Sequence, residues 1–139
     1  MGESLKTGLK HRAELIVTDD MTVPGNADRL ASFADMPNVF ATAFYVAFIE
    51  ATCLDLVRPF LQAGQHTVGT LVGVTHIAAT PVGMKVFAQV ELVEVEERRL
   101  AFKVMCRDEI EEIGSGLHER YIIDMERFME KVERKSGSS

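Results

Sequence analysis

Three polar side chains lie among apolar residues and could do chemistry together: Thr42, Glu50 and His76. Glu50 directly follows the apolar run 40–49, where an ionised carboxylate is costly unless it is paired or hydrated. A carboxylate kept in such a place could activate a water molecule or attack a carbonyl carbon itself. The structural alternative is that Glu50 faces a solvated seam or forms an ion pair.

His76 is a suitable partner for that carboxylate. A neutral imidazole can orient or deprotonate a water molecule at neutral pH, and a carboxylate close by raises its basicity. His76 has Val74 and Ala78 as its neighbours on the same face of a predicted strand, so it could also be a hydrogen-bonded residue of the core.

Thr42 opens a predicted helix, where the structural alternative is an N-cap hydroxyl that binds a free backbone N–H. On one helix, the eight residues from Thr42 to Glu50 correspond to about 12 Å along the axis, which is too far for contact. A joint site therefore requires a bent entry to the helix, or one residue from each subunit of a dimer.

Two glycines, Gly69 and Gly73, flank this chemistry on the strand that leads to His76. Glycines there allow a ligand to approach backbone N–H groups, as an oxyanion site requires. The structural alternative is that they only allow the helix to pack closely. The sequence contains no phosphate-binding loop of the Walker type, and its four histidines lack the spacing of a zinc site. We therefore predict no metal and no cofactor.

Hydrophobic periodicity places these residues on their elements. Apolar residues fill the run Phe40–Leu61, which predicts one long helix that is covered on several sides. A short helix is predicted over 26–34, and Gly64 occupies a position typical of a helix end. Alternating patterns predict strands over 11–18, 68–77, 84–94, 100–106 and 110–124, with a hairpin tip at 96–99 and a final helix over Met125–Lys135.

One strand, one long helix and four further strands with short connections predict an α+β fold with an antiparallel sheet. A sheet of about five strands wrapped around one long central helix is the hotdog fold, and it accounts for the apolar circumference of the helix. Such a sheet leaves an open edge, which pairing of two subunits removes. We expect a homodimer, which could pair further into a dimer of dimers.

Composition narrows the class of protein. The 139 residues fit one hotdog domain over 1–135 with a flexible tail over 136–139. Lys and Arg number 15 against 21 Asp and Glu, a net charge of −6 that argues against nucleic-acid binding.

The longest apolar stretch, 39–49, is shorter than the roughly 20 residues of a membrane span. Cys53 and Cys106 fit reduced thiols, and no apolar export signal opens the chain, so we expect a cytoplasmic protein.

Several segments together resemble the fluoroacetyl-CoA thioesterase family of single-domain hotdog proteins. The resemblance spans about residues 9–131. The segments that carry it are Val39-Phe40-Ala41-Thr42, Phe48-Ile49-Glu50-Ala51-Thr52-Cys53, Val68-Gly69-Thr70, Val74-Thr75-His76-Ile77-Ala78-Ala79-Thr80-Pro81-Val82-Gly83 and Glu112-Ile113-Gly114-Ser115-Gly116-Leu117-His118-Glu119-Arg120.

The resemblance implies hydrolysis of a short acyl-CoA thioester to the free acid and CoA, with CoA as part of the substrate. It implies that Thr42, Glu50 and His76 are catalytic, and that Gly69 lies against the thioester carbonyl. Glu50 and His76 would deliver water, or Glu50 would attack and form a transient anhydride; Thr42 would bind Glu50 or the acyl group. Arg120 would lie near a CoA phosphate or in a buried ion pair.

The chain departs from the family at the acyl pocket. The fluoroacetyl-specific enzyme has a phenylalanine gate just before the central helix, and the matching position here is Met36, with Phe33 and Phe40 nearby. Methionine is flexible and fills irregular space. We therefore expect a broader or different short acyl group.

Two other functions remain open from the sequence. Fold does not fix function, so the chain could be a non-catalytic acyl-CoA-binding hotdog module. A hotdog hydratase acting on enoyl-CoA ranks last, because nothing around His76 supplies the aspartate that such a site pairs with histidine in one short segment.

Overall fold

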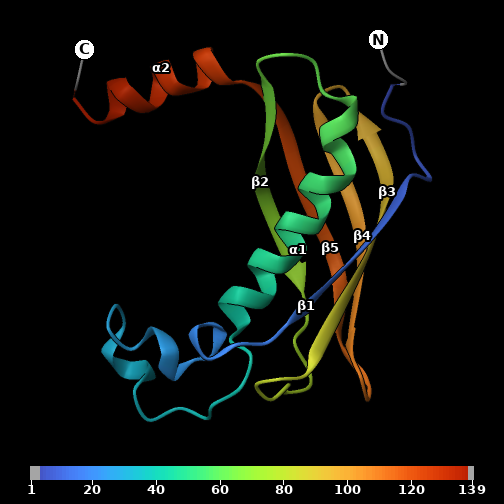
Figure 1. Ribbon diagram of the computed structural model, residues 1–139. Helices are drawn as coiled ribbons and strands as arrows, with labels where there is room; N and C mark the ends of the chain where they lie inside the picture. Colours follow the sequence, from blue (N-terminus) through green and yellow to red (C-terminus); the bar gives the residue numbers. More distant parts are fainter. Residues whose placement is uncertain (1–3, 138–139) are drawn as a thin grey trace.

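The computed structural model describes residues 4–137 and shows one antiparallel sheet curled around one long helix (Figure 1). The five strands lie in the order β1-β3-β4-β5-β2, so the hotdog prediction is confirmed. The tail predicted over 136–139 ends at residues outside the described range. The elements are β1 (Lys10–Ile16), α1 (Thr42–Val57), β2 (Gln65–Val74), β3 (Lys85–Glu96), β4 (Arg99–Asp108), β5 (Glu112–Asp124) and α2 (Met125–Lys135).

Helix α1 is shorter at both ends than the predicted run Phe40–Leu61. It ends at Val57 because Pro59 has no N–H to continue the helical hydrogen bonds, and a single 3-10 turn (Arg58–Phe60) follows. It starts at Thr42 because the chain just before it is extended: the Phe40 N–H donates to the Thr80 carbonyl. Gly64, with φ of +82°, does not end the helix but lies in the turn that enters β2.

The short helix predicted over 26–34 is wrong. In its place the chain has the end of one 3-10 turn (Pro24–Asn26) and a second turn (Ala31–Phe33), and a further turn (Asp19–Met21) precedes them. None of these turns contains a buried residue, so no packing stabilises a longer helix, and short helices are marginal without packing.

His76 lies beyond the strand on which it was predicted. Strand β2 ends at Val74 rather than at residue 77, so His76 follows it by two residues. The neighbouring backbone still runs beside β5, since the Thr75 N–H donates to the Ser115 carbonyl (2.9 Å) and the Ile77 N–H to the Ile113 carbonyl (2.7 Å). His76 is therefore held by the sheet without being part of its ladder.

The core fills the space between α1 and the concave face of the sheet. Alternate residues of β3 and β4 point at the helix and are almost fully buried, as the period of two requires. The helix contributes every third or fourth residue to the same core: Tyr45, Phe48, Ile49, Thr52, Cys53, Leu56 and Val57.

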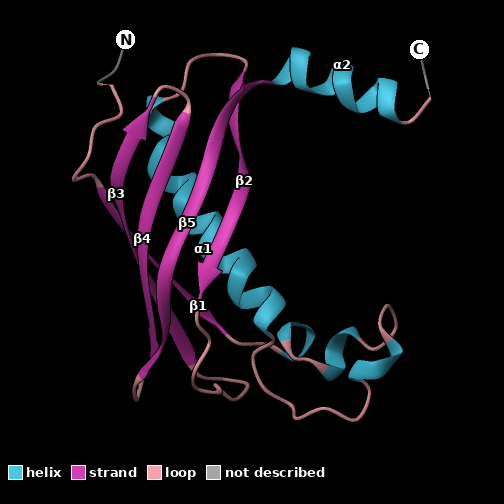
Figure 2. Cartoon of the chain, turned by 180° about the vertical axis from the view of Figure 1, so that it is seen from behind, coloured by secondary structure: helices cyan, strands magenta, loops and turns pink. Residues whose placement is uncertain are grey.

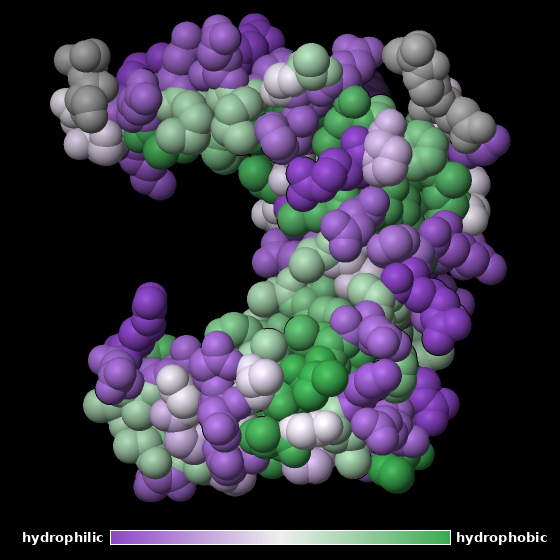
Figure 3. Space-filling model, in the orientation of Figure 1, coloured by the Kyte–Doolittle hydropathy of each residue, from purple (hydrophilic) through white to green (hydrophobic). Residues whose placement is uncertain are grey.

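Helix α2 extends away from the sheet (Figure 2). Its apolar side chains Met125, Met129 and Val132 are each about two-fifths exposed. A hollow opens between α2 and the segment 19–41 (Figure 3). The neighbouring edge strand β2 exposes Leu71 and Val72. Within the described residues, no helix combines the length and the hydropathy of a membrane span.

The packing of α1 on the sheet predicts that substitution of two isoleucines by alanine lowers the free energy of unfolding by different amounts. Ile49 is fully buried, so Ile49→Ala should lower the free energy of unfolding by about 2–5 kcal/mol. Ile16 on β1 is half exposed, so Ile16→Ala should cost no more than about 1 kcal/mol. Urea unfolding of both variants measures the difference, and equal costs would contradict the described core.

Candidate active site

Thr42 and His76 meet at the start of α1. The Thr42 Oγ1 lies 2.8 Å from the His76 Nδ1, across 34 residues of sequence. The N-cap alternative for Thr42 is wrong, because Ala41 occupies the N-cap and Thr42 is already the first helical residue. Its hydroxyl is thus used for a tertiary contact, and we call these two residues the Thr42–His76 pair.

Aromatic rings enclose the imidazole of His76. The Tyr45 ring stacks on it with centroids 4.5 Å apart, and Phe40 meets it edge-on at 6.5 Å. Burial lowers the pKa of His76, so the ring is neutral at neutral pH. Its Nε2 is the one buried side-chain nitrogen or oxygen in residues 4–137 that has no hydrogen-bond partner. A hollow of about 250 Å³ lies beside the pair, lined by Val23, Val39, Phe40, Thr42, His76, Ile77, Ala78 and Ala79.

Glu50 lies further along α1 and pairs with Arg120 of β5. The carboxylate Oε2 accepts a hydrogen bond of 2.9 Å from the guanidinium. The Arg120 side chain is only 4% exposed, whereas that of Glu50 is 39% exposed. The sequence left two alternatives for Glu50, a solvated seam or an ion pair. The structure shows features of both, since the carboxylate pairs with Arg120 and stays partly exposed. Arg120 is thus in an ion pair, one of its two expected places, in which its own side chain is buried and that of Glu50 is partly exposed.

Arg120 is held on its other sides as well. Its Nε donates to the Thr67 Oγ1 (2.8 Å), and a terminal nitrogen donates to the Thr67 carbonyl (2.9 Å). The nitrogen that binds Glu50 also lies 3.1 Å from the His118 Nε2. Every nitrogen of the guanidinium therefore has a partner, as a buried charge requires.

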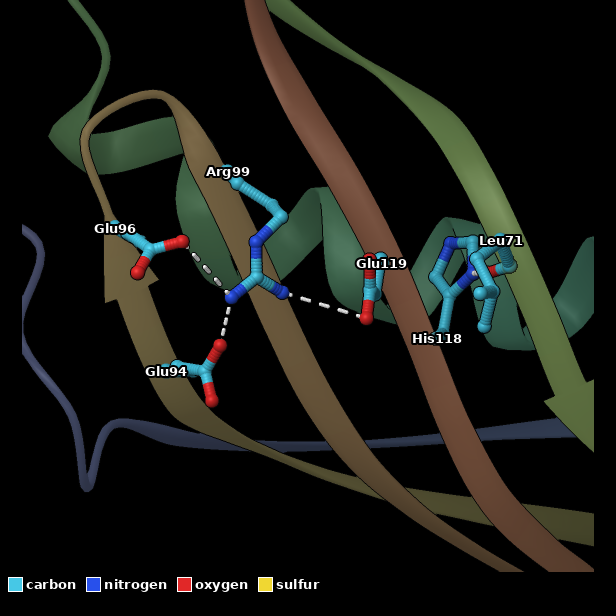
Figure 4. Close-up of polar contacts among 6 residues, drawn as sticks. All are labelled: Leu71, Glu94, Glu96, Arg99, His118 and Glu119. Atoms are coloured by element: carbon cyan, nitrogen blue, oxygen red, sulfur yellow. Dashed lines mark hydrogen bonds and ion pairs between the residues drawn. The ribbon is translucent and has the colours of Figure 1, made fainter.

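His118 completes this group and was not singled out from the sequence. Its Nδ1 lies 2.8 Å from the Leu71 carbonyl (Figure 4), which can only accept, so Nδ1 carries the proton and Nε2 accepts from Arg120. Burial lowers the pKa of His118, and the Arg120 charge lowers it further. Its spacing of two from Arg120 on a strand, which puts both on one face, was the available signal.

Gly69 lies directly opposite Arg120 in the pairing of β2 with β5. A Cβ added there would come within 2.7 Å of the Glu50 Oε2 and 3.3 Å of the guanidinium. The Glu50 carboxylate thus lies against the backbone of β2, where a side chain would displace it. We call Glu50, Gly69, His118 and Arg120 the Glu50 cluster.

The two groups lie at different heights of one helix. Thr42 and Glu50 both belong to the continuous helix α1, so about 12 Å separates them along its axis. A bent entry that would bring them together is therefore ruled out. In residues 4–137, the hydrogen bonds and ion pairs of Glu50 and of the Thr42–His76 pair have no residue in common.

The chain is similar to known proteins over most of its length. The model of the fluoroacetyl-CoA-specific thioesterase family matches residues 17–126. The fluoroacetyl-CoA thioesterase of Streptantibioticus cattleyicolor is 39% identical over 136 residues, which is 98% of both chains. The chain belongs to the fluoroacetyl-CoA-specific thioesterase family.

Solved structures agree with that assignment. A structure of the fluoroacetyl-CoA thioesterase FlK matches with a TM-score of 0.93, 39% identity and coverage of 96% of this chain and 98% of that one. A thioesterase superfamily member from Thermus thermophilus matches with a TM-score of 0.83, 25% identity and coverage of 96% and 97%. Membership of a thioesterase family confirms the prediction of an enzyme over that of a non-catalytic binding module.

Of the three residues expected at the acyl pocket, one lines the hollow beside His76 and two do not. Phe40 is buried beside His76 and lines the 250 Å³ hollow. Met36 is 48% exposed, and Phe33 is partly buried in the 3-10 turn Ala31–Phe33. Neither Met36 nor Phe33 lines that hollow in the single chain.

The two cysteines of the thioesterase chain belong to its core. Cys53 and Cys106 are free and buried, and burial raises the pKa of each thiol to about 12. No set of three His, Cys, Asp or Glu side chains in residues 4–137 is arranged to hold a metal ion.

The Glu50 cluster predicts a pH-dependent stability. The unfolded histidine has a pKa of about 6.5, and the folded value of His118 is lower, so the unfolded chain binds more protons below that pH. The free energy of unfolding should therefore fall as the pH decreases from about 6.5 towards the folded pKa. In His118→Asn the fall should be smaller.

Urea unfolding at a series of pH values between about 7 and 5 measures this fall. His66→Asn, at an exposed position of β2, is the matched control and should keep the wild-type slope. A His118→Asn profile parallel to that of the wild type would show that His118 does not contribute.

Proposed function

We propose that the protein hydrolyses a short acyl-CoA thioester to the free acid and CoA, with Thr42, Glu50 and His76 as the catalytic residues. The Thr42–His76 contact of 2.8 Å carries this proposal, because it joins two of the three residues in a chain of the thioesterase family. The relative FlK has been solved with acetyl-CoA, and also with fluoroacetate and CoA, in variants of that enzyme. The reaction needs no cofactor, since CoA is part of the substrate.

Water would attack the thioester carbonyl carbon, and the C–S bond would break to release CoA as the thiol. The neutral His76 ring can take a proton from that water at Nε2, which has no hydrogen-bond partner. Nδ1 meanwhile keeps its contact with the Thr42 hydroxyl. Glu50 would serve as a second base, or attack the carbonyl itself and form an anhydride that water then opens. The Gly69 N–H would hold the thioester oxygen in either route.

A homodimer would bring the separated groups together. Glu50 cannot reach His76 of its own chain along a straight α1, so we propose that each site takes Glu50 from one subunit and the Thr42–His76 pair from the other. Exposed apolar residues on β2 and α2 border the hollow between α2 and the segment 19–41 (Figure 3), and a second copy would cover them. Free, buried Cys53 and Cys106 fit the reducing cytoplasm that we propose for this dimer.

The acyl group need not be fluoroacetyl. Met36 stands where the family's aromatic gate is expected, and its flexible side chain should admit acyl groups of more than one shape. Phe33, in the same segment, and Phe40, in the hollow beside His76, would complete the acyl pocket. We propose a short-chain acyl-CoA substrate of broader range.

Catalytic roles predict loss of CoA release without loss of fold. Glu50→Gln and His76→Ala should each lower kcat/KM at least ~100-fold, the effect of losing an acid or base group. The assay measures free thiol from acetyl-, fluoroacetyl- and longer acyl-CoA thioesters, with far-ultraviolet circular dichroism as the folding control. Unchanged hydrolysis in both variants would refute the assigned roles, and intact thioesters with the wild type would refute the activity.

A site shared between subunits predicts that two inactive variants complement each other. Glu50→Gln and His76→Ala chains, refolded together, should pair randomly, so about half of the dimers are mixed and one of the two sites in each is intact. The mixture should recover about a quarter of wild-type activity. Each variant refolded alone is the control, and a mixture no more active than these would place the whole site within one chain.

A further inference from the structure

Tyr45 is a buried polar residue to which the reaction above gives no role. It lies on α1 one turn after Thr42, and its side chain is fully buried. A phenol in the core needs a hydrogen-bond partner, and a leucine or methionine would fill the same space without one. The contacts of this ring and hydroxyl both lead to His76.

The Tyr45 ring stacks on the imidazole. The centroids are 4.5 Å apart and the planes are 23° from parallel. Phe40 touches the same imidazole edge-on, at 80°. The two aromatic rings thus restrict rotation of the imidazole about its side-chain bonds, while Thr42 holds one of its nitrogens.

The Tyr45 hydroxyl holds the backbone next to His76. It donates a hydrogen bond of 2.7 Å to the carbonyl of Thr75, the residue just before His76. Burial raises the pKa of the phenol, so the hydroxyl keeps the proton that it donates. Because His76 lies beyond the end of β2, this bond adds a constraint where the regular ladder has stopped.

Gly114 of β5 leaves the room that this bond occupies. A Cβ added at Gly114 would lie 2.2 Å from the Tyr45 hydroxyl oxygen and 2.0 Å from the Thr75 carbonyl oxygen. Any side chain there would separate the two groups. The hydroxyl-to-carbonyl contact therefore depends on residues from α1, β5 and the segment after β2.

We propose that Tyr45 is a positioning residue for thioester hydrolysis, which acts through His76. Its ring and hydroxyl fix the imidazole so that Nδ1 stays on Thr42 while Nε2 faces the attacking water. This inference rests on the proposed function and deepens it. Misplacement of a reacting group by 1 Å can cost about 100-fold in rate, so a residue without contact to substrate can control kcat.

Two substitutions separate the ring from the hydroxyl. Tyr45→Phe keeps the stacked ring and loses the bond to Thr75, and Tyr45→Leu loses both. We expect kcat to fall about 3- to 10-fold in Tyr45→Phe and about 100-fold in Tyr45→Leu, with KM changed less than about twofold. Phe48→Leu is the matched control, since Phe48 is buried on the same helix and the ring contacts of His76 in residues 4–137 are with Tyr45 and Phe40.

An NMR measurement that does not depend on hydrolysis accompanies the kinetic assay. Nitrogen-15 NMR of labelled histidine reports the tautomer and environment of the imidazole, with His76→Ala used to assign the resonances. We expect one neutral tautomer in the wild type and Phe48→Leu, and a mixture of both in Tyr45→Leu. Because this result is independent of hydrolysis, it distinguishes failure of this inference from failure of the proposed function.

The inference is overturned if Tyr45→Leu reduces kcat no more than Phe48→Leu does, if its loss lies in KM, or if its His76 resonances are those of the wild type. Should Tyr45→Leu not fold, Tyr45→Phe decides alone. Lowered kcat with shifted His76 resonances then supports the positioning role, and wild-type values of both refute it.

Discussion

The ion pair between Arg120 and Glu50 is the interaction on which the middle of this molecule depends. A guanidinium that is 4% exposed must have a partner at every nitrogen, and here Glu50, Thr67 and His118 supply them. Glu50 belongs to the helix and the other residues to the sheet, so the pair sets the height at which α1 crosses β2 and β5. The carboxylate also occupies the space that a side chain at position 69 would need, so any residue larger than Gly69 would have to displace it.

This fixed height determines how the reactive residues are distributed. With Glu50 held at the middle of α1, the start of the same helix must lie about 12 Å away, and Thr42 is there. The Thr42–His76 pair is consequently built on a separate set of contacts, with aromatic rings around the imidazole and an unpartnered Nε2. One chain therefore presents two separate groups of polar residues, which the proposed dimer would bring together in one site.

Much of this arrangement was predictable from the sequence, because it depends on local patterns. Period-two alternation located the strands, and the apolar circumference of the Phe40–Leu61 run indicated a helix wrapped by a sheet. The final helix was predicted with the observed bounds, Met125–Lys135. The turns within 26–34 were mistaken for a helix because that segment has helix-compatible residues but no packing partner, which a local pattern does not reveal.

The partners of the site residues were harder to predict because they are long-range. Thr42 was assigned an N-cap as its structural alternative, yet its hydroxyl contacts a residue 34 positions away. His118 lacked any zinc spacing and was therefore passed over, although its Nδ1 is held by the Leu71 carbonyl, 47 positions away, and its Nε2 accepts from Arg120. Residue type and spacing can indicate that Glu50 needs a partner, but the packing of α1 against β5, across 70 positions of sequence, determines that the partner is Arg120.

A crystal structure of the assembled protein with a non-hydrolysable acyl-CoA analogue would show whether two subunits share one site. The decisive quantities are the two distances from the analogue's carbonyl carbon, to the Glu50 carboxylate of one chain and to the His76 Nε2 of the other. We expect both groups to lie within reach of that carbon, directly or through one water molecule. A monomer, or a dimer in which Glu50 and His76 of different chains face separate cavities, would contradict it.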